Sequence, residues 1–345
     1  MQIKLHHYSY EITIIPKGRN DFIESEIIKQ NDPKTCLIYA EKFIKGRWPE
    51  AEHVIIKDPS CAANYCLEVI KGRWPEAEIE IAKSFEASEY YKNIIKNRWV
   101  EGESYFLNSY SKIHSYLEFL KNKKISSEGI ENNIVLCLEK NPGNNNYESP
   151  EEVAFRYVQD FKKSRWPEAE HIIMKNPRNA FEYAKDYIKG RWPEAEENII
   201  NYDPEYYNTD FPVIAYAKEI IKGRWPEAEK IIVSNPKISF EYAKKVIQGR
   251  WLEAEELISK EPAFAYQYAK EIIKGRWPEA ELFIAKNIFY AYQYAKNIIK
   301  ARLPEEMHNM VVMNGINDPK NESLKKYLGY KKYKKEIKRR KPVGC

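Results

Sequence analysis

Arginine, tryptophan and tyrosine recur along this chain at a regular spacing that can support nucleic-acid binding. Every tryptophan directly follows an arginine, and a tyrosine lies eight residues before each of those arginines. The tryptophans are Trp48, Trp74, Trp99, Trp166, Trp192, Trp225, Trp251 and Trp277. Aromatic rings stack on the bases of single-stranded nucleic acid, and guanidinium groups stack on bases and bind phosphates. One chemistry open to these residues is therefore the binding of a single strand along a groove.

A structural role explains the same residues better. Most copies continue as Trp-Pro-Glu-Ala-Glu, and residues that are identical in every copy are what identical interfaces between stacked units require. A base-reading surface needs systematically variable residues beside the constant ones, and the position after Glu-Ala-Glu mixes apolar residues with both charges. We predict that the tryptophans pack between repeats. Each arginine is expected to pair with a glutamate three or five residues later, as Arg224 with Glu227 or Glu229, or with a glutamate of the adjacent unit.

The C-terminal stretch is the second candidate for binding. Residues 320–345 have a net charge of +9, which leaves −4 for the rest of a chain whose total is +5. Clustered cations with interleaved tyrosines attract RNA, DNA or an anionic membrane surface, whereas a solvated tail that aids solubility is the simpler alternative. Its tyrosines can also cap the last hairpin. The residues predicted to bind a polyanion are Lys331, Lys332, Lys334, Lys335, Lys338, Arg339, Arg340 and Lys341.

Histidine and cysteine show no catalytic or metal-binding pattern. The six histidines are scattered, and His53 and His171 occupy the same position in their repeats. A zinc site needs convergent ligands, and a nucleophile needs a neighbouring base, which no local spacing here supplies. We predict a protein that is not an enzyme and that binds no metal and no cofactor.

The period of the motif predicts a repeat architecture. The arginines at 224, 250 and 276 are 26 residues apart, and a ninth copy begins at Arg302. A fixed period of roughly 20–50 residues indicates stacked supersecondary units. The period is interrupted by a degenerate unit at 104–130, where Tyr116 precedes Lys124 by the usual eight residues, and by insertions near 142–150 and 201–211.

Each unit predicts two short helices. In the unit 224–249, proline and glutamates suit the first turn of one helix, and Asn235-Pro236 marks a turn. Apolar residues from Phe240 to Ile247 then follow a helical period, and Gly249 is expected to end that helix in the left-handed conformation. The predicted fold is all-α, an α-solenoid of about 10–11 stacked helical hairpins.

Three segments follow from this pattern. Residues 1–30 are predicted to form an N-terminal cap or a degenerate repeat, with a short strand or irregular cap in 1–16 and a weak motif copy at 17–19. Residues 31–307 form the helical-hairpin array, and residues 308–345 form the basic C-terminal tail.

Composition sets the expected location. No apolar run approaches the roughly 18 residues that a membrane span needs, and no basic-then-apolar leader opens the chain. An odd number of cysteines without Cys-x-x-Cys pairs favours free thiols in a reducing compartment. We expect a cytoplasmic protein, located in the host cell cytoplasm if the chain is viral.

The iterated Ile-Lys-Gly-Arg-Trp-Pro-Glu-Ala-Glu, with an upstream Tyr-Ala, resembles short helical repeats in uncharacterised proteins of bacteriophages and large DNA viruses. The resemblance covers roughly residues 35–103 and 155–306 and implies a viral or phage origin and an α-solenoid fold, with no established activity. Stacked hairpins usually bind another macromolecule. We predict a non-catalytic scaffold or adaptor that binds a host or viral protein through its solenoid surface. The alternative is a nucleic-acid-binding protein that uses the basic tail and the solenoid groove.

Overall fold

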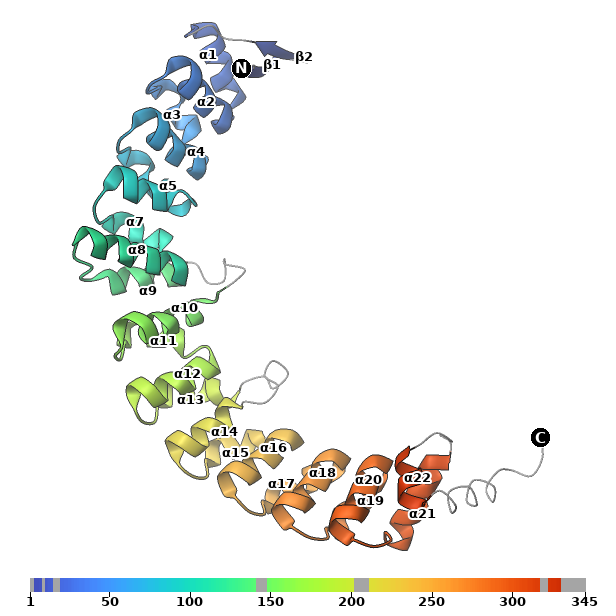
Figure 1. Ribbon diagram of the computed structural model, residues 1–345. Coiled ribbons are helices and arrows are strands. Elements are labelled where there is room, and N and C mark those ends of the chain that lie inside the picture. Colours follow the sequence, from blue (N-terminus) through green and yellow to red (C-terminus); the bar gives the residue numbers. More distant parts are fainter. Residues whose placement is uncertain are drawn as a thin grey trace, which may run out of the picture. The chain divides into compact units, whose positions relative to one another are not determined.

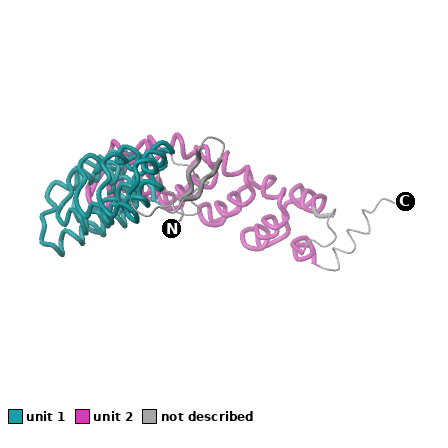
Figure 2. The backbone as a smooth tube through the Cα atoms, turned by 90° about the horizontal axis from the view of Figure 1, so that it is seen from above, with its two compact units in different colours: residues 1–173 teal, residues 174–345 magenta. Residues whose placement is uncertain are grey.

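Short helices that follow one another in pairs build this protein. The computed structural model describes residues 3–7, 10–14, 19–140, 148–201, 211–316 and 322–329, and these residues are helical apart from connections and one β-hairpin. They belong to two compact units, unit 1 (Met1–Ile173) and unit 2 (Met174–Cys345) (Figure 1 and Figure 2). Within each unit, first helices pack on first helices and second helices on second helices of the next pair. The predicted all-α solenoid of helical hairpins is confirmed.

Unit 1 begins with an antiparallel pair of strands, β1 (Ile3–His7) and β2 (Tyr10–Ile14), with Ile3 opposite Ile14. The short strand predicted near the N-terminus is therefore present, beside the first helix. The α-helices of unit 1 are α1 (Asp21–Gln30), α2 (Pro33–Tyr39), α3 (Pro49–Ile55), α4 (Pro59–Asn64), α5 (Glu78–Lys83), α6 (Ala87–Tyr90), α7 (Val100–Phe106), α8 (Tyr110–Lys123), α9 (Ile130–Lys140), α10 (Pro150–Tyr157) and α11 (Glu170–Ile173). Short 3₁₀ turns, η3 (Pro75–Ala77) and η6 (Pro167–Ala169), precede α5 and α11.

Unit 2 continues the same alternation. Its α-helices are α12 (Pro177–Tyr183), α13 (Pro193–Ile200), α14 (Pro212–Tyr216), α15 (Pro226–Ile232), α16 (Pro236–Tyr242), α17 (Leu252–Lys260), α18 (Pro262–Tyr268), α19 (Pro278–Ala285), α20 (Ile288–Tyr294), α21 (Glu305–Ile316) and α22 (Glu322–Leu328). Proline occupies the first turn of most of these helices, where its missing N–H costs no hydrogen bond. Asn235 caps α16, because its side chain accepts the N–H groups of Lys237 and Ile238. The predicted turn at Asn235-Pro236 is thus the start of the second helix.

The second helix of most repeats ends in one wide π turn. These segments are η1 (Ala40–Ile44), η2 (Tyr65–Ile70), η4 (Tyr91–Ile95), η5 (Val158–Lys162), η7 (Ala184–Ile188), η8 (Ala217–Ile221), η9 (Ala243–Ile247), η10 (Ala269–Ile273) and η11 (Ala295–Ile299). In one of them the N–H of Lys189 donates to the carbonyl of Ala184 at 2.7 Å, and Lys189 takes a φ of 61°. A bond that spans five residues closes the helix with a left-handed residue, as in other helix C-caps.

The prediction that Gly249 ends its helix in the left-handed conformation is wrong. Gln248 takes that conformation, with a φ of 56°, and the only described glycines with positive φ are Gly129 and Gly329. The π turn ends at Ile247, so the cap falls one residue before the glycine.

The degenerate unit keeps its register but loses the π turn. Helix α8 is regular over 14 residues, and the hydroxyl of Tyr116 accepts the N–H of Trp99 at 2.8 Å. Lys124 is the left-handed cap of α8, so this helix continues for two residues beyond the position at which the others end.

The boundaries of the array also change. Arg19 pairs with Glu24 at 2.9 Å, which repeats the arginine–glutamate pair of the later motifs and extends the array towards the N-terminus. The tail boundary predicted at 308 falls inside α21, and α22 packs on α20. Residues 142–147, 202–210 and 330–345, which hold most of both insertions and the predicted polyanion-binding lysines and arginines, lie outside the described residues.

Candidate functional site

The constant residues of each repeat form one hydrogen-bonded cluster. Arg224 donates two hydrogen bonds to Glu229, from Nε to Oε1 at 2.9 Å and from Nη2 to Oε2 at 2.6 Å. The hydroxyl of Tyr242 accepts the backbone N–H of Trp225 at 2.7 Å and donates to Glu229 Oε1 at 2.9 Å. Hydrogen bonds from Arg224 lower the pKa of Glu229, and burial raises the pKa of Tyr242. The predicted pair five residues apart is therefore observed, with the repeat tyrosine as a third member.

A repeat tyrosine with a motif tryptophan on both sides links two successive motifs. Its hydroxyl bonds to the backbone of the preceding tryptophan, and its ring contacts the following one, as Tyr242 does with Trp251 at 5.2 Å between ring centroids. The tryptophan–tyrosine hydrogen bonds within the two units include Trp74–Tyr90, Trp99–Tyr116, Trp192–Tyr216, Trp225–Tyr242, Trp251–Tyr268 and Trp277–Tyr294. The structure places all eight predicted packing tryptophans in the core, with at most 3% of any residue exposed. Their rings present no face on which a base can stack.

A row of exposed lysines occupies the second helices of unit 2. Each member lies two residues after the repeat tyrosine. This lysine row consists of Lys185, Lys218, Lys244, Lys270 and Lys296. The ammonium groups of Lys185 and Lys244 lie 5.7 Å from the ring centroids of Phe181 and Phe240, four residues earlier on the same helices. Cation–π contacts of this kind hold the ammonium over the ring while it stays in water.

Ion pairs join Lys185 and Lys244 to the second helix of the next repeat, whereas Lys218, Lys270 and Lys296 form none among the described residues. Lys185 pairs with Glu219 at 2.8 Å, and Lys244 pairs with Glu271 at 2.7 Å. In the repeat after Lys218, the position of Glu219 and Glu271 is occupied by Lys245, a cation that pairs with Glu241 on its own helix at 2.8 Å. Lys218 consequently has no carboxylate partner among the described residues.

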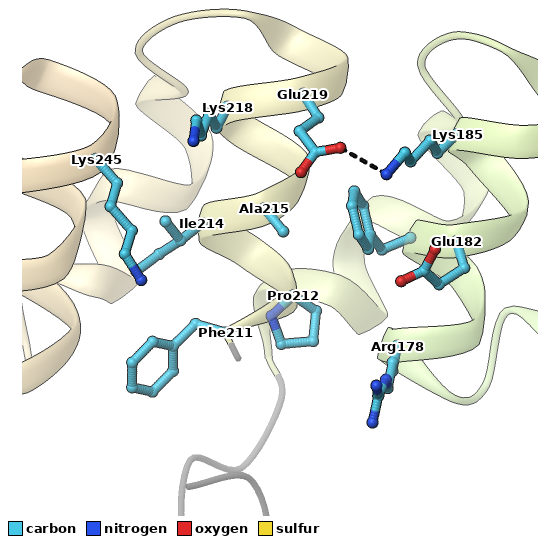
Figure 3. A pocket seen from close by; sticks show the side chains of 11 residues that line it. Arg178, Glu182, Lys185, Phe211, Pro212, Ile214, Ala215, Lys218, Glu219 and Lys245 are labelled. Carbon is cyan, nitrogen blue, oxygen red and sulfur yellow. Dashed lines mark ion pairs between the residues drawn. The ribbon is translucent and has the colours of Figure 1, made fainter. Parts of the chain in front are cut away.

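A cavity of about 320 Å³ lies beside Lys218 (Figure 3). The second helices of three successive repeats, α12 with η7, α14 with η8, and η9, contribute its walls. Its apolar lining consists of Phe181, Phe211, Pro212, Ile214 and Ala215, and its charged lining consists of Arg178, Glu182, Lys185, Lys218, Glu219 and Lys245. Figure 3 shows Lys218 and Lys245 on one side of the cavity, and Arg178 and Glu182 on the other.

The sequence already carried the signal for the lysine row. Reading two residues beyond each repeat tyrosine finds lysine in five consecutive copies, from Lys185 to Lys296. The variable position after Glu-Ala-Glu, on the first helix, does not reveal this second-helix pattern, so the lysine row was not predicted.

Other candidate groups have local partners. His171 Nε2 lies 2.8 Å from Glu139 Oε1, and His308 Nδ1 lies 2.7 Å from the hydroxyl of Tyr327. The part of the chain that the structure describes contains no group of three or more histidine, cysteine or acidic side chains placed to bind one metal ion. Within the same residues, no helix has the length and apolar character needed to cross a bilayer. The described cysteines, Cys36, Cys61, Cys66 and Cys137, are buried and form no disulfide among the described residues.

No family model, curated protein or solved structure matches this chain. The viral or phage origin implied by the motif stays a prediction, and the surface chemistry of unit 2 is the basis for a function.

Proposed function

We propose that this protein is a non-catalytic scaffold that binds another protein through the second-helix face of unit 2. The observation that carries this proposal is the contrast between two repeated sets of residues. The motif arginine, tryptophan, tyrosine and glutamate contact one another, whereas the lysine row is exposed at the same position of successive helices. Packed helices lie roughly 8–10 Å apart, so the row offers regularly spaced cations to a partner that extends along several repeats.

The charges beside the row favour a protein partner. Glu219 and Glu271 lie beside the lysine row and pair with Lys185 and Lys244. Carboxylates therefore occupy the surface on which a nucleic-acid strand would place its phosphates. Phe181 and Phe240 are buried beneath their lysines, so these two rings offer no face for stacking on bases. Mixed charge around apolar side chains is typical of surfaces that recognise proteins.

Affinity capture tests the proposal. The tagged chain, with and without residues 330–345, is incubated with an extract of its native cells in the presence of nuclease. Truncation after Gly329 retains α22, so every described hairpin stays intact. We expect the same proteins to remain bound to both forms.

Binding of single-stranded RNA and DNA to the two forms, at low and at physiological salt, is the competing measurement. Tail-dependent binding that weakens steeply with salt is compatible with the scaffold, because counterion release dominates such contacts. Micromolar or tighter binding that survives removal of residues 330–345 would contradict the proposal and favour a nucleic-acid-binding protein. The cytoplasmic location belongs to this proposal too, and fractionation of the native cells tests it.

A further inference from the structure

We propose that the cavity of unit 2 binds an acidic peptide segment of the partner, with one large apolar side chain seated in it and flanking carboxylates on Arg178 and Lys218. This inference rests on the proposed function and specifies the chemistry of the partner.

The size and lining of the cavity suit a single side chain. About 320 Å³ is near the lower end of ligand pockets, which span roughly 300–1,000 Å³. Phe181, Phe211 and Ile214 are each less than 7% exposed, so the apolar lining is fixed by the core beneath it. An aromatic or large aliphatic side chain gains burial there without any rearrangement of the helices.

The charged rim contains two cations without an ion pair among the described residues. Lys218 is exposed and lacks the carboxylate that Lys185 and Lys244 each receive from the next repeat. Arg178, in the first turn of α12, is also exposed and forms no ion pair among the described residues. Neither cation pairs with a carboxylate of the described residues, so carboxylates of a bound segment would supply the missing partners.

The rim also contains acidic groups that discriminate between ligands. Glu182 and Glu219 line the same cavity, and Lys185 holds Glu219 in place at 2.8 Å. A carboxylate accepts hydrogen bonds from backbone N–H groups, which a peptide supplies and a nucleic-acid backbone does not. A phosphate chain carries a negative charge on every nucleotide and offers the two carboxylates no such donor, whereas a peptide carries its carboxylates only at some positions. The geometry thus favours a peptide.

The first step of the test selects peptides on the immobilised full-length protein from a displayed library of random octapeptides. We expect enrichment of peptides that combine an aromatic or large aliphatic residue with at least two aspartates or glutamates. Enrichment of basic or uncharged peptides, or no enrichment, overturns the inference.

The second step locates the site with an enriched, fluorescently labelled peptide. The double variant R178E/K218E should weaken binding by at least about ten-fold, because two attractions become repulsions. The control K270E/K296E makes the same change of charge on the lysine row, outside the cavity, and should weaken binding by less than about two-fold. Equal weakening by both variants, or by neither, overturns the inference, as does displacement of the peptide by poly(U) RNA at matching affinity.

The outcomes separate this inference from the proposed function. All four substituted side chains are exposed, so both double variants should melt like the parent. If R178E/K218E retains every captured protein but the parent binds no acidic peptide, the scaffold stands and only the peptide inference fails. If the parent captures no protein, the proposed function fails.

Discussion

Trp225 illustrates how the constant residues of a repeat contact one another. Its ring centroid lies 5.0 Å from that of Tyr216, and its backbone N–H binds the hydroxyl of Tyr242. Only 1% of the residue is exposed. The same tyrosine hydroxyl and Arg224 both bind Glu229, so the side chains that first suggested chemistry stabilise the fold.

Truncating this tryptophan should therefore act on stability. We expect Trp225→Ala to lower the free energy of unfolding by about 3–5 kcal/mol, the usual cost of replacing a buried aromatic residue with alanine. Thermal and urea unfolding followed by circular dichroism measures the change. Leu252→Ala, at a residue that is 69% exposed in the following motif, is the control and should stay within about 0.5 kcal/mol of the parent. A Trp225→Ala protein that melts like the parent but loses its partner would show that the packing assignment is wrong.

At the scale of the element, the residue that ends the second helix is not the residue type that best suits its backbone conformation. Lys222 takes a φ of 62°, a left-handed conformation that L side chains rarely adopt, while the following Gly223 does not need positive φ. We expect Lys222→Gly to raise the free energy of unfolding by about 0.5–1 kcal/mol. Gly223→Ala, whose Cβ would meet no atom within 4 Å, should change it by less than about 0.5 kcal/mol. Urea unfolding compares the two variants, and a destabilised Lys222→Gly would contradict the π-turn geometry.

Gly102 differs because its missing side chain makes room for a ring. It replaces the motif alanine, and a Cβ at this position would lie 2.6 Å from Cδ2 of Trp99. The Trp99 ring is also held against Phe106, with centroids 5.6 Å apart. Gly102→Ala should consequently cost about 1–3 kcal/mol, as overpacked core substitutions do. The same urea experiment measures this cost, and a neutral result would mean that the ring moves freely.

Local signals in the sequence predicted most of the helices. The features that were not predicted depend on hydrogen bonds and packing contacts that residue types alone do not mark. Proline after the motif tryptophan acts on the backbone around it, so the start of the first helix was predicted correctly. Asn235-Pro236 was predicted as a turn, and it forms the cap and first residue of the second helix. The π turn depends on a hydrogen bond such as that of Lys189 to Ala184, which no residue type marks. Helix α22 was assigned to the tail because its lysines dominate the composition, although Leu324 is buried.

The candidate cavity could not be predicted for a related reason. The lysine row is visible in the sequence, and so is Lys245 at the position where Glu219 and Glu271 pair with row lysines in other repeats. The cavity itself depends on how the second helices of three successive repeats pack, and spacing along the chain does not determine that.

At the scale of the whole molecule, the buried tyrosines should make stability sensitive to high pH. Burial raises the pKa of Tyr65 to about 12, above the ordinary value near 10, and raises the pKa of the other repeat tyrosines that have the same environment. Because the pKa is raised in the folded state, this stabilisation is complete below pH 10 and is lost as the pH rises from 10 towards 12. We expect cooperative unfolding in that range, with tyrosinate absorbance and loss of helical circular dichroism changing together. Tyrosines that titrate near pH 10 without loss of helix would contradict the buried clusters.

The scaffold proposal makes the lysine row, and no other set of lysines, the surface that a partner contacts. The measurement that tests it most directly compares protein capture by two triple variants after nuclease treatment of the extract. K218E/K270E/K296E reverses the row lysines that have no ion pair among the described residues, and K175E/K230E/K286E makes the same change of charge on exposed lysines of the first helices or the residues after them. We predict that both variants melt like the parent, that the row variant loses the captured proteins, and that the control variant retains them. Retention of the same proteins by the row variant, or their equal loss from both variants, would contradict the account.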